Sequence, residues 1–144
     1  MSATKTTWPL WFKIAVGAAV LWSLAGVGAY IGDVTMSEET LAGMPEAQRA
    51  LYETRPGWVV GAYAIAVFAA LAGAILLVLR NKLATPLLGV SLLAVIVQMG
   101  FVLFGMNAVA TLGASAAVFP AVIVILGAAM LWLSMTGASR GWIG

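Results

Sequence analysis

Two polar side chains that could form hydrogen bonds within a membrane, Ser91 and Gln98, lie seven residues apart inside a long apolar run. That spacing places both on one face of a helix, with Gln98 near its middle. In hydrocarbon the Gln98 amide needs a partner or a water molecule, because an unpaired polar group is costly there. It could line a small cavity and bind a ligand hydroxyl. It could also form a hydrogen bond between helices, worth about 1 kcal/mol, and we favour this second interpretation.

Other reactive groups are scarce in this chain. It contains no cysteine and no histidine, which removes the common ligands of zinc, haem and iron–sulfur clusters and the usual base of a nucleophilic triad. All five acidic residues lie between Asp33 and Glu53, outside the middle of any long apolar run. Proton relays and ion-coupled carriers generally depend on charged residues near the middle of a membrane-spanning segment. We therefore predict a protein that is not an enzyme and that has no cofactor or metal site.

The composition is that of an integral membrane protein. Of the 144 residues, 63% are hydrophobic and only 8% are charged, which is far from the range of soluble domains. The net charge of +2 is small, and the basic residues lie near the ends of the apolar runs. We therefore expect the lipid bilayer as a partner and no nucleic acid.

Four apolar segments are long enough to cross a bilayer, which needs about 20 residues of helix. They are residues 10–31, 58–79, 83–106 and 114–135. Asn107 is expected to cap the third helix. The prediction is a single all-α domain, a bundle of four transmembrane helices with a polar outer loop at 32–57.

The distribution of basic residues predicts the orientation. One side of the predicted topology carries five of them, and the other side carries only Arg49 and Arg55. The five are Lys5, Lys13, Arg80, Lys82 and Arg140. Because cytoplasmic loops are enriched in Lys and Arg, both termini are expected in the cytoplasm and the acidic loop outside. This topology predicts a multi-pass protein of a bacterial inner membrane.

The polar loop has the signals of short surface helices. Thr35 and Glu38 fit a capping box, and Ser37 also precedes a pair of glutamates suited to a helix N-terminus. Pro45 suits the first position of a second helix. Arg49 can pair with Glu46 three residues earlier and with Glu53 four residues later. An apolar stripe could form from Leu41, Met44, Ala47 and Leu51. We expect an amphipathic helical loop that covers the bundle, with a docking surface for a partner as the alternative.

The second apolar segment carries alanine at every fourth position. These residues are Ala62, Ala66, Ala70 and Ala74. The first segment offers a similar series, Ala15, Ala19, Ser23 and Gly26. Because membrane helices associate through close packing of small residues, we predict that the first two helices pack together. The alanine face could alternatively contact a second copy or another subunit.

Several short sequences resemble a family of small four-helix inner-membrane proteins of proteobacteria. They are WPLW at 8–11, LWSLAG at 21–26, LYETRPGWVV at 51–60 and LLGVSLL at 87–93. The resemblance spans most of the chain and rests on aromatic and glycine positions. It implies the same four-helix fold. Automated labels in that family include sugar transporter, and its members are largely uncharacterised.

Two functions follow as expectations. The first is a non-catalytic inner-membrane protein that serves as an accessory or structural subunit of a larger complex. The alternative is a transporter of a small solute, such as a sugar, that acts as an oligomer with Gln98 and Ser91 along its path. A third possibility, a small oxidoreductase-associated membrane enzyme, is opposed by the missing histidines and cysteines.

Overall fold

A computed structural model of the chain describes residues 7–106 and 112–144. The predictions that concern Lys5 and Asn107 lie outside the described residues. Within the described residues all regular structure is helical, which confirms the all-α prediction.

Four long helices form the body of the protein. They are α1 (Leu10–Val34), α4 (Gly57–Val78), α5 (Ala84–Gly100) and α7 (Val118–Ser139). A π-helical turn, η1 (Phe101–Gly105), continues α5, and a 3-10 turn, η2 (Ala114–Ala117), precedes α7. With η1 included, each long helix has the length and apolar composition of a membrane span. The chain is therefore a multi-pass membrane protein with four helices that can cross the bilayer.

The helix boundaries differ from the predicted ones at two places. Helix α1 extends to Val34 and therefore includes Asp33, a charge that the sequence placed in the loop. Helix α7 begins at Val118 and ends at Ser139, several residues later than predicted. Pro120 falls in its first turn, where a missing N–H breaks no helical hydrogen bond.

Two short helices, α2 (Glu38–Ala42) and α3 (Glu46–Thr54), connect α1 to α4, as predicted for the loop. The expected capping box is wrong. Thr35 ends α1, and its hydroxyl donates to the carbonyl of Ile31 at 2.6 Å. Ser37 caps α2 instead and accepts a hydrogen bond from the Thr40 N–H at 3.1 Å.

The second loop helix follows the local signals of the sequence more closely. Pro45 stands immediately before the first residue of α3 and acts as its N-cap, one position earlier than expected. Of the two ion pairs predicted for Arg49, the one with Glu53 is present, with 3.7 Å between Nε and Oε1. The described residues form no ion pair between Arg49 and Glu46. Both side chains are well exposed, so the pair adds little stability.

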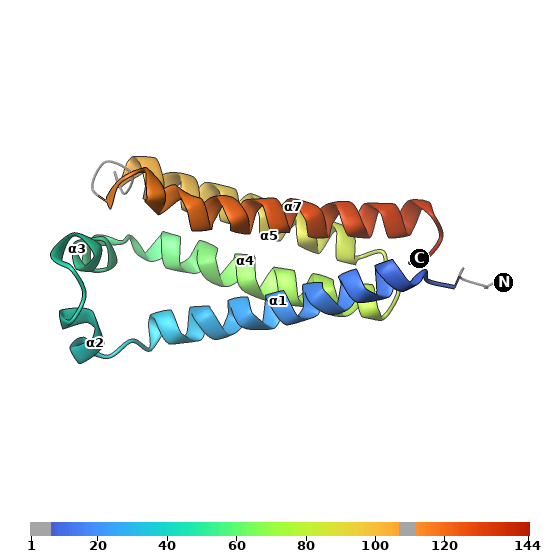
Figure 1. Ribbon diagram of the computed structural model, residues 1–144, viewed down its shortest axis with the longest axis horizontal. Coiled ribbons are helices and arrows are strands. Elements are labelled where there is room, and N and C mark those ends of the chain that lie inside the picture. The colour runs from blue at the N-terminus through green and yellow to red at the C-terminus, as the bar shows by residue number, and fades with distance from the viewer. Residues whose placement is uncertain (1–6, 107–111) are drawn as a thin grey trace.

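The long helices run alongside one another between two distinct ends (Figure 1). The loop end carries α2 and α3, and the terminal end carries Trp8, the α4–α5 turn and Gly144. Helix α4 has its most extensive contact with α5. Its second contact is with α1, and this is the packing that the sequence predicted. Helix α7 packs mainly on α5 and touches α1 only slightly.

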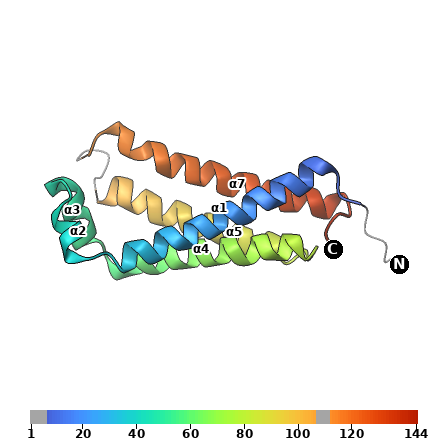
Figure 2. The same ribbon diagram turned by 60° about the horizontal axis from the view of Figure 1, so that its bottom comes forward.

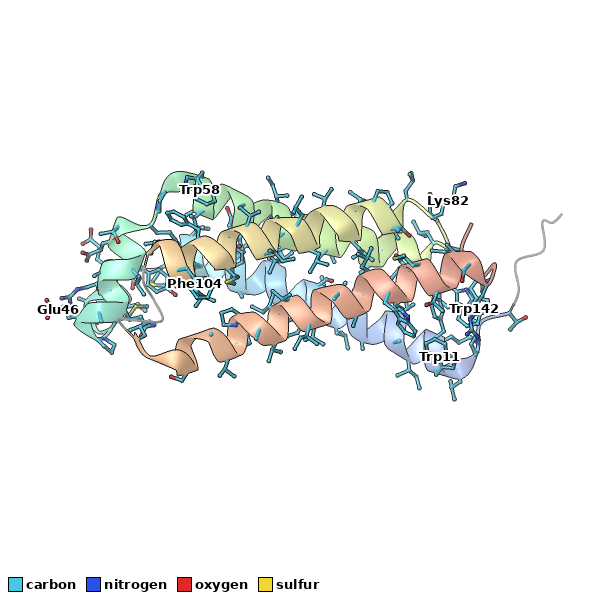
Figure 3. All side chains as sticks on the ribbon, turned by 90° about the horizontal axis from the view of Figure 1, so that it is seen from above. Trp11, Glu46, Trp58, Lys82, Phe104 and Trp142 are labelled. Atoms are coloured by element: carbon cyan, nitrogen blue, oxygen red, sulfur yellow. The ribbon has the colours of Figure 1, made fainter. Side chains whose placement is uncertain are left out.

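Aromatic side chains pack tightly at the terminal end. Phe12 is fully buried, and its ring contacts those of Trp8 and Trp142, each with centroids 4.8 Å apart. The Trp8 indole N–H donates to the carbonyl of Trp142 at 2.7 Å. Figure 3 shows Trp11 and Trp142 gathered at this end, with Glu46 at the opposite one. These contacts hold α1 against the end of α7 and close the terminal end.

Candidate ligand-binding cavity

The helices separate toward the loop end and enclose a cavity of about 710 Å³. Figures 1 and 2 show α1 and α7 close together at the terminal end and apart at the loop end. All four long helices contribute to the cavity wall, and α3 lies over its loop end through Leu51 and Tyr52. The volume falls in the range of about 300–1,000 Å³ that is usual for small-molecule sites. The lining is mainly apolar.

The alanine face of α4 serves both packing and the cavity. Ala74 is fully buried in the core, and Ala66 and Ala70 form part of the cavity wall. Ala62 is half-buried. Small side chains at 66 and 70 leave room for the cavity, because a larger side chain at either position would project into it.

A close contact between α4 and α5 occurs at Gly73, which is not part of the alanine series. A Cβ added at Gly73 would lie 2.7 Å from two side-chain carbons of Leu88. Gly73 itself is buried. This glycine therefore brings the two helices together beneath the cavity, a role that the alanine spacing alone did not reveal.

Ser91 lines the cavity but has a structural partner. Its side chain is 7% exposed, and its hydroxyl donates to the carbonyl of Ala66 at 2.6 Å. Such a bond links α5 to α4 through the backbone. The hydroxyl proton is thus committed, and Ser91 can offer a ligand only a lone pair.

Gln98 lines the same cavity and is 4% exposed. Its Oε1 has no hydrogen-bond partner among the described residues. A buried acceptor without a partner costs about 1–3 kcal/mol. The interhelical bond that we favoured from the sequence is therefore not made by this oxygen. The Gln98 carbonyl oxygen remains available to a donor in the cavity.

Ser23 supplies a second buried polar atom without a partner. It projects from α1 into the cavity, is 2% exposed, and its Oγ has no partner among the described residues. Gly26, one turn later, lies against Val67 of α4, beside the Ala66 carbonyl that bonds Ser91. Gln98 follows Ser91 by two turns toward the loop end, so Ser23 lies nearer the terminal end than Gln98. The spacing of small residues predicts Ser23 only as part of a packing face. A single hydroxyl among small residues does not indicate whether it packs against a helix or lines a cavity.

An ion pair lies beside the cavity at the loop end. Arg55 donates to Asp33 through two nitrogens, Nη2 to Oδ1 at 2.6 Å and Nη1 to Oδ2 at 3.2 Å. The side chains are 16% and 12% exposed, and the Arg55 guanidinium also lies over the ring of Tyr52. The hydrogen bond to Asp33 raises the pKa of Arg55 above its ordinary value, against an opposing effect of burial. Arg55 therefore remains charged and its charge is balanced.

The third unpartnered atom belongs to this ion pair. The Arg55 Nε is buried and has no acceptor among the described residues, and both Arg55 and Asp33 line the cavity. No local sequence pattern predicts this pair, because the two residues are 22 positions apart with two short helices between them. Their common feature is that each stands next to an end of an apolar segment.

The site can recognise a molecule by hydrogen bonds and apolar contact. No group of three or more acidic residues among the described residues is placed to hold a metal ion. The cavity offers an acceptor at Gln98, a hydroxyl at Ser23 and a donor at Arg55. Comparisons with protein-family models, curated proteins and solved structures each return no match for this chain. The resemblance to a proteobacterial family stays a prediction.

Proposed function

We propose that this protein is a non-catalytic membrane protein that binds an uncharged small molecule in the cavity between its helices. The observation that carries the proposal is the concentration of unpartnered polar atoms in one place. Oε1 of Gln98, Oγ of Ser23 and Nε of Arg55 are all buried, and all three residues line the same cavity.

The energetic argument rests on the cost of leaving these atoms unpaired. Each costs about 1–3 kcal/mol when it has no partner, and a ligand that pairs with it recovers that amount. Isolated water molecules could also pair with them, but the surrounding wall is mainly apolar and is better matched by hydrocarbon. A ligand that combines apolar bulk with a few polar groups satisfies both parts of the wall.

The same wall argues against a sugar as the bound molecule. A sugar carries many hydroxyl groups and needs a similar number of partners, whereas this wall is mainly apolar and presents few polar atoms. Transport of any solute through the bundle would also require the aromatic cluster of Trp8, Phe12 and Trp142 to open. Binding in a cavity closed at one end is the simpler function.

A second candidate function is that of an accessory subunit, and one feature of α1 favours it. Gly28 and Gly32 form a GxxxG pair on an exposed part of the helix. A Cβ built at either position meets nothing within 4 Å. Such a pair permits close approach of another membrane helix. This surface is separate from the alanine face that the sequence analysis selected.

Thermal unfolding in detergent with a panel of uncharged molecules tests the binding function. The panel contains sugars, short alcohols, amides and single-chain lipids. A ligand at about 100 times its dissociation constant stabilises the folded protein by about 2.7 kcal/mol, so its unfolding temperature rises measurably. The stabilisation should disappear in Ala70→Leu, which fills the cavity, and persist in Ala128→Leu, which adds the same bulk to an exposed position of α7. If no molecule of the panel stabilises the wild-type protein, the proposal fails.

A further inference from the structure

We infer that the bound molecule is a single-chain amphiphile with an uncharged head group, and that it reaches the cavity sideways from the membrane, between α1 and α7. This inference rests on the proposed function and gives it a ligand class and a route. Its basis is the position of the opening, the kind of polar atoms within the cavity and the length of the cavity.

The cavity reaches the surface between α1 and α7. Ala25 and Ala29 of α1 and Phe119 of α7 line the cavity and are also exposed. These helices touch only slightly, with ring contacts of Trp11 at the terminal end. Both are apolar and long enough to span a membrane, so the opening between them faces hydrocarbon.

Side chains of the described residues lie across both ends of the cavity. At the terminal end the cluster around the fully buried Phe12 fills the space between α1 and α7. At the loop end Leu51 and Tyr52 of α3 line the cavity from above. The ion pair of Arg55 with Asp33 ties this cover to the end of α1. A molecule dissolved in the bilayer therefore has a shorter route to the cavity than one dissolved in water.

The polar atoms near the loop end define the head group. Gln98 presents a carbonyl oxygen and requires a donor, whereas Arg55 presents Nε and requires an acceptor. Ring contact between Trp58 and Phe101 at 4.8 Å shows that α4 and α5 are adjacent at this depth. Because Asp33 already balances the charge of Arg55, an ionised head group would bring an uncompensated charge into the cavity. The head is therefore neutral and carries both a donor and an acceptor, as in an amide or a hydroxylated ester.

The remaining cavity suits a hydrocarbon chain. Asp33 and Ser23 are ten residues apart on α1, which corresponds to about 15 Å along the helix. Between those levels the lining includes Val95 and Ile123, and Met130 lies farther toward the terminal end. An extended chain fills such a space, whereas a compact solute would leave part of it empty.

Photolabelling in phosphatidylcholine vesicles tests the inference with a matched pair of probes. One probe is palmitamide with a diazirine in its chain, which offers both a donor and an acceptor. The other is its N,N-dimethyl derivative, which keeps the acceptor and the chain but has no donor. Since one hydrogen bond contributes about 1 kcal/mol, palmitamide should label the cavity about fivefold more than the derivative at equal concentration. Labelled peptides should include Ala25 and Ile123, and unlabelled palmitamide should compete.

Variants at Gln98 test whether this residue recognises the hydrogen-bond donor of the head group. In Gln98→Leu the two probes should label the cavity equally, whereas Val97→Leu, at an exposed neighbouring position of α5, should retain the difference. The comparison of probes in the wild-type protein stands even if Gln98→Leu does not fold. Equal labelling of the wild-type cavity by both probes would mean that any lipid chain fills it, and this outcome overturns the inference. Labelling confined to outward positions such as Leu93 and Ile125 overturns it as well.

Photolabelling and the thermal-unfolding panel together distinguish an incorrect ligand class from an absence of binding. If a water-soluble molecule stabilises the protein, and Ala70→Leu abolishes that effect while palmitamide leaves the cavity unlabelled, the function stands and the lipid class is wrong. If neither the probes nor the panel bind the cavity, both proposals fail.

Discussion

Arg55 and Asp33 form two side-by-side hydrogen bonds, at 2.6 and 3.2 Å, that join the residue after α3 to the last turn of α1. This bidentate contact connects the loop end of the bundle to the first helix. Both side chains are mostly shielded from water, so neither can lose its partner without a cost. The pair therefore holds α3 in place above the cavity.

Removal of one partner should destabilise the protein strongly. Asp33→Asn leaves the Arg55 cation without a balancing charge, and we expect a loss of about 3 kcal/mol in the free energy of unfolding. The measurement is chemical unfolding in detergent. As a control, Arg49→Ala removes only an exposed ion pair and should cost less than about 0.5 kcal/mol. The double variant Asp33→Leu with Arg55→Leu should lose less unfolding free energy than the sum of the losses in Asp33→Leu alone and Arg55→Leu alone. An additive result would contradict direct coupling.

The contribution of Arg55 to the free energy of unfolding should not change between neutral and moderately alkaline pH. Its pKa is raised in the folded protein, mainly by the hydrogen bond to Asp33. A raised pKa of Arg55 contributes stability at every pH below its pKa in the unfolded chain, and this stability is lost only as the pH rises through the higher pKa of the folded protein. The difference in unfolding free energy between wild type and Arg55→Gln should therefore stay constant from about pH 7 to pH 10. A decline within that window would show that Arg55 is not the charged partner.

Two serine-to-alanine changes in the cavity should have opposite effects on stability. Ser91→Ala removes a hydrogen bond to the Ala66 carbonyl and should cost about 1 kcal/mol. Ser23→Ala removes a buried hydroxyl that has no partner, and should stabilise the empty protein by about 1 kcal/mol. Both values come from unfolding of delipidated protein in detergent. If Ser23→Ala instead destabilises the empty protein, the hydroxyl has a partner and contributes less to the site than we propose.

The contact of Gly73 with Leu88 should tolerate no side chain. In Gly73→Ala the new Cβ would lie 2.7 Å from the Leu88 side chain, so either that side chain must shift or α4 and α5 must move apart, at a cost of about 1–3 kcal/mol. Replacement of Leu88 by alanine in the same protein should recover part of this loss. Gly61→Ala is the matched control, because its Cβ meets nothing within 4 Å and alanine favours a helix. Equal effects at the two glycines would contradict the close approach.

The exposed glycine pair of α1 should control association if the protein is an accessory subunit. Gly28→Ile should weaken a helix contact at this surface and lower the mass of the complex extracted from membranes in mild detergent. Gly89→Ile, at an open position of α5, serves as the control. The masses are read by native gel and mass spectrometry. An unchanged complex in Gly28→Ile would remove the observation that favours a subunit role.

Much of the fold follows from local composition, which explains why it was predictable. Four apolar runs of sufficient length form four long helices, and the Arg49–Glu53 pair forms because residues four apart share a helix face. The choice of Gln98 as an interior polar residue also follows from its neighbours alone. Signals near the helix ends were weaker, because Thr35 can either end one helix or cap the next, and its hydroxyl bonds back to Ile31.

The cavity and its polar atoms depend on how the helices are arranged, which no local pattern contains. Local composition was enough to predict an all-helical membrane protein with a short helical loop between its first two spans. The separation of α1 and α7 toward the loop end, the shared cavity of Ser23 and Gln98, and the contact of Asp33 with Arg55 appear only once the helices are packed together. The physical reason is that helix length depends on nearby residues, whereas the angle between two helices depends on contacts between distant ones, such as Gly73 with Leu88.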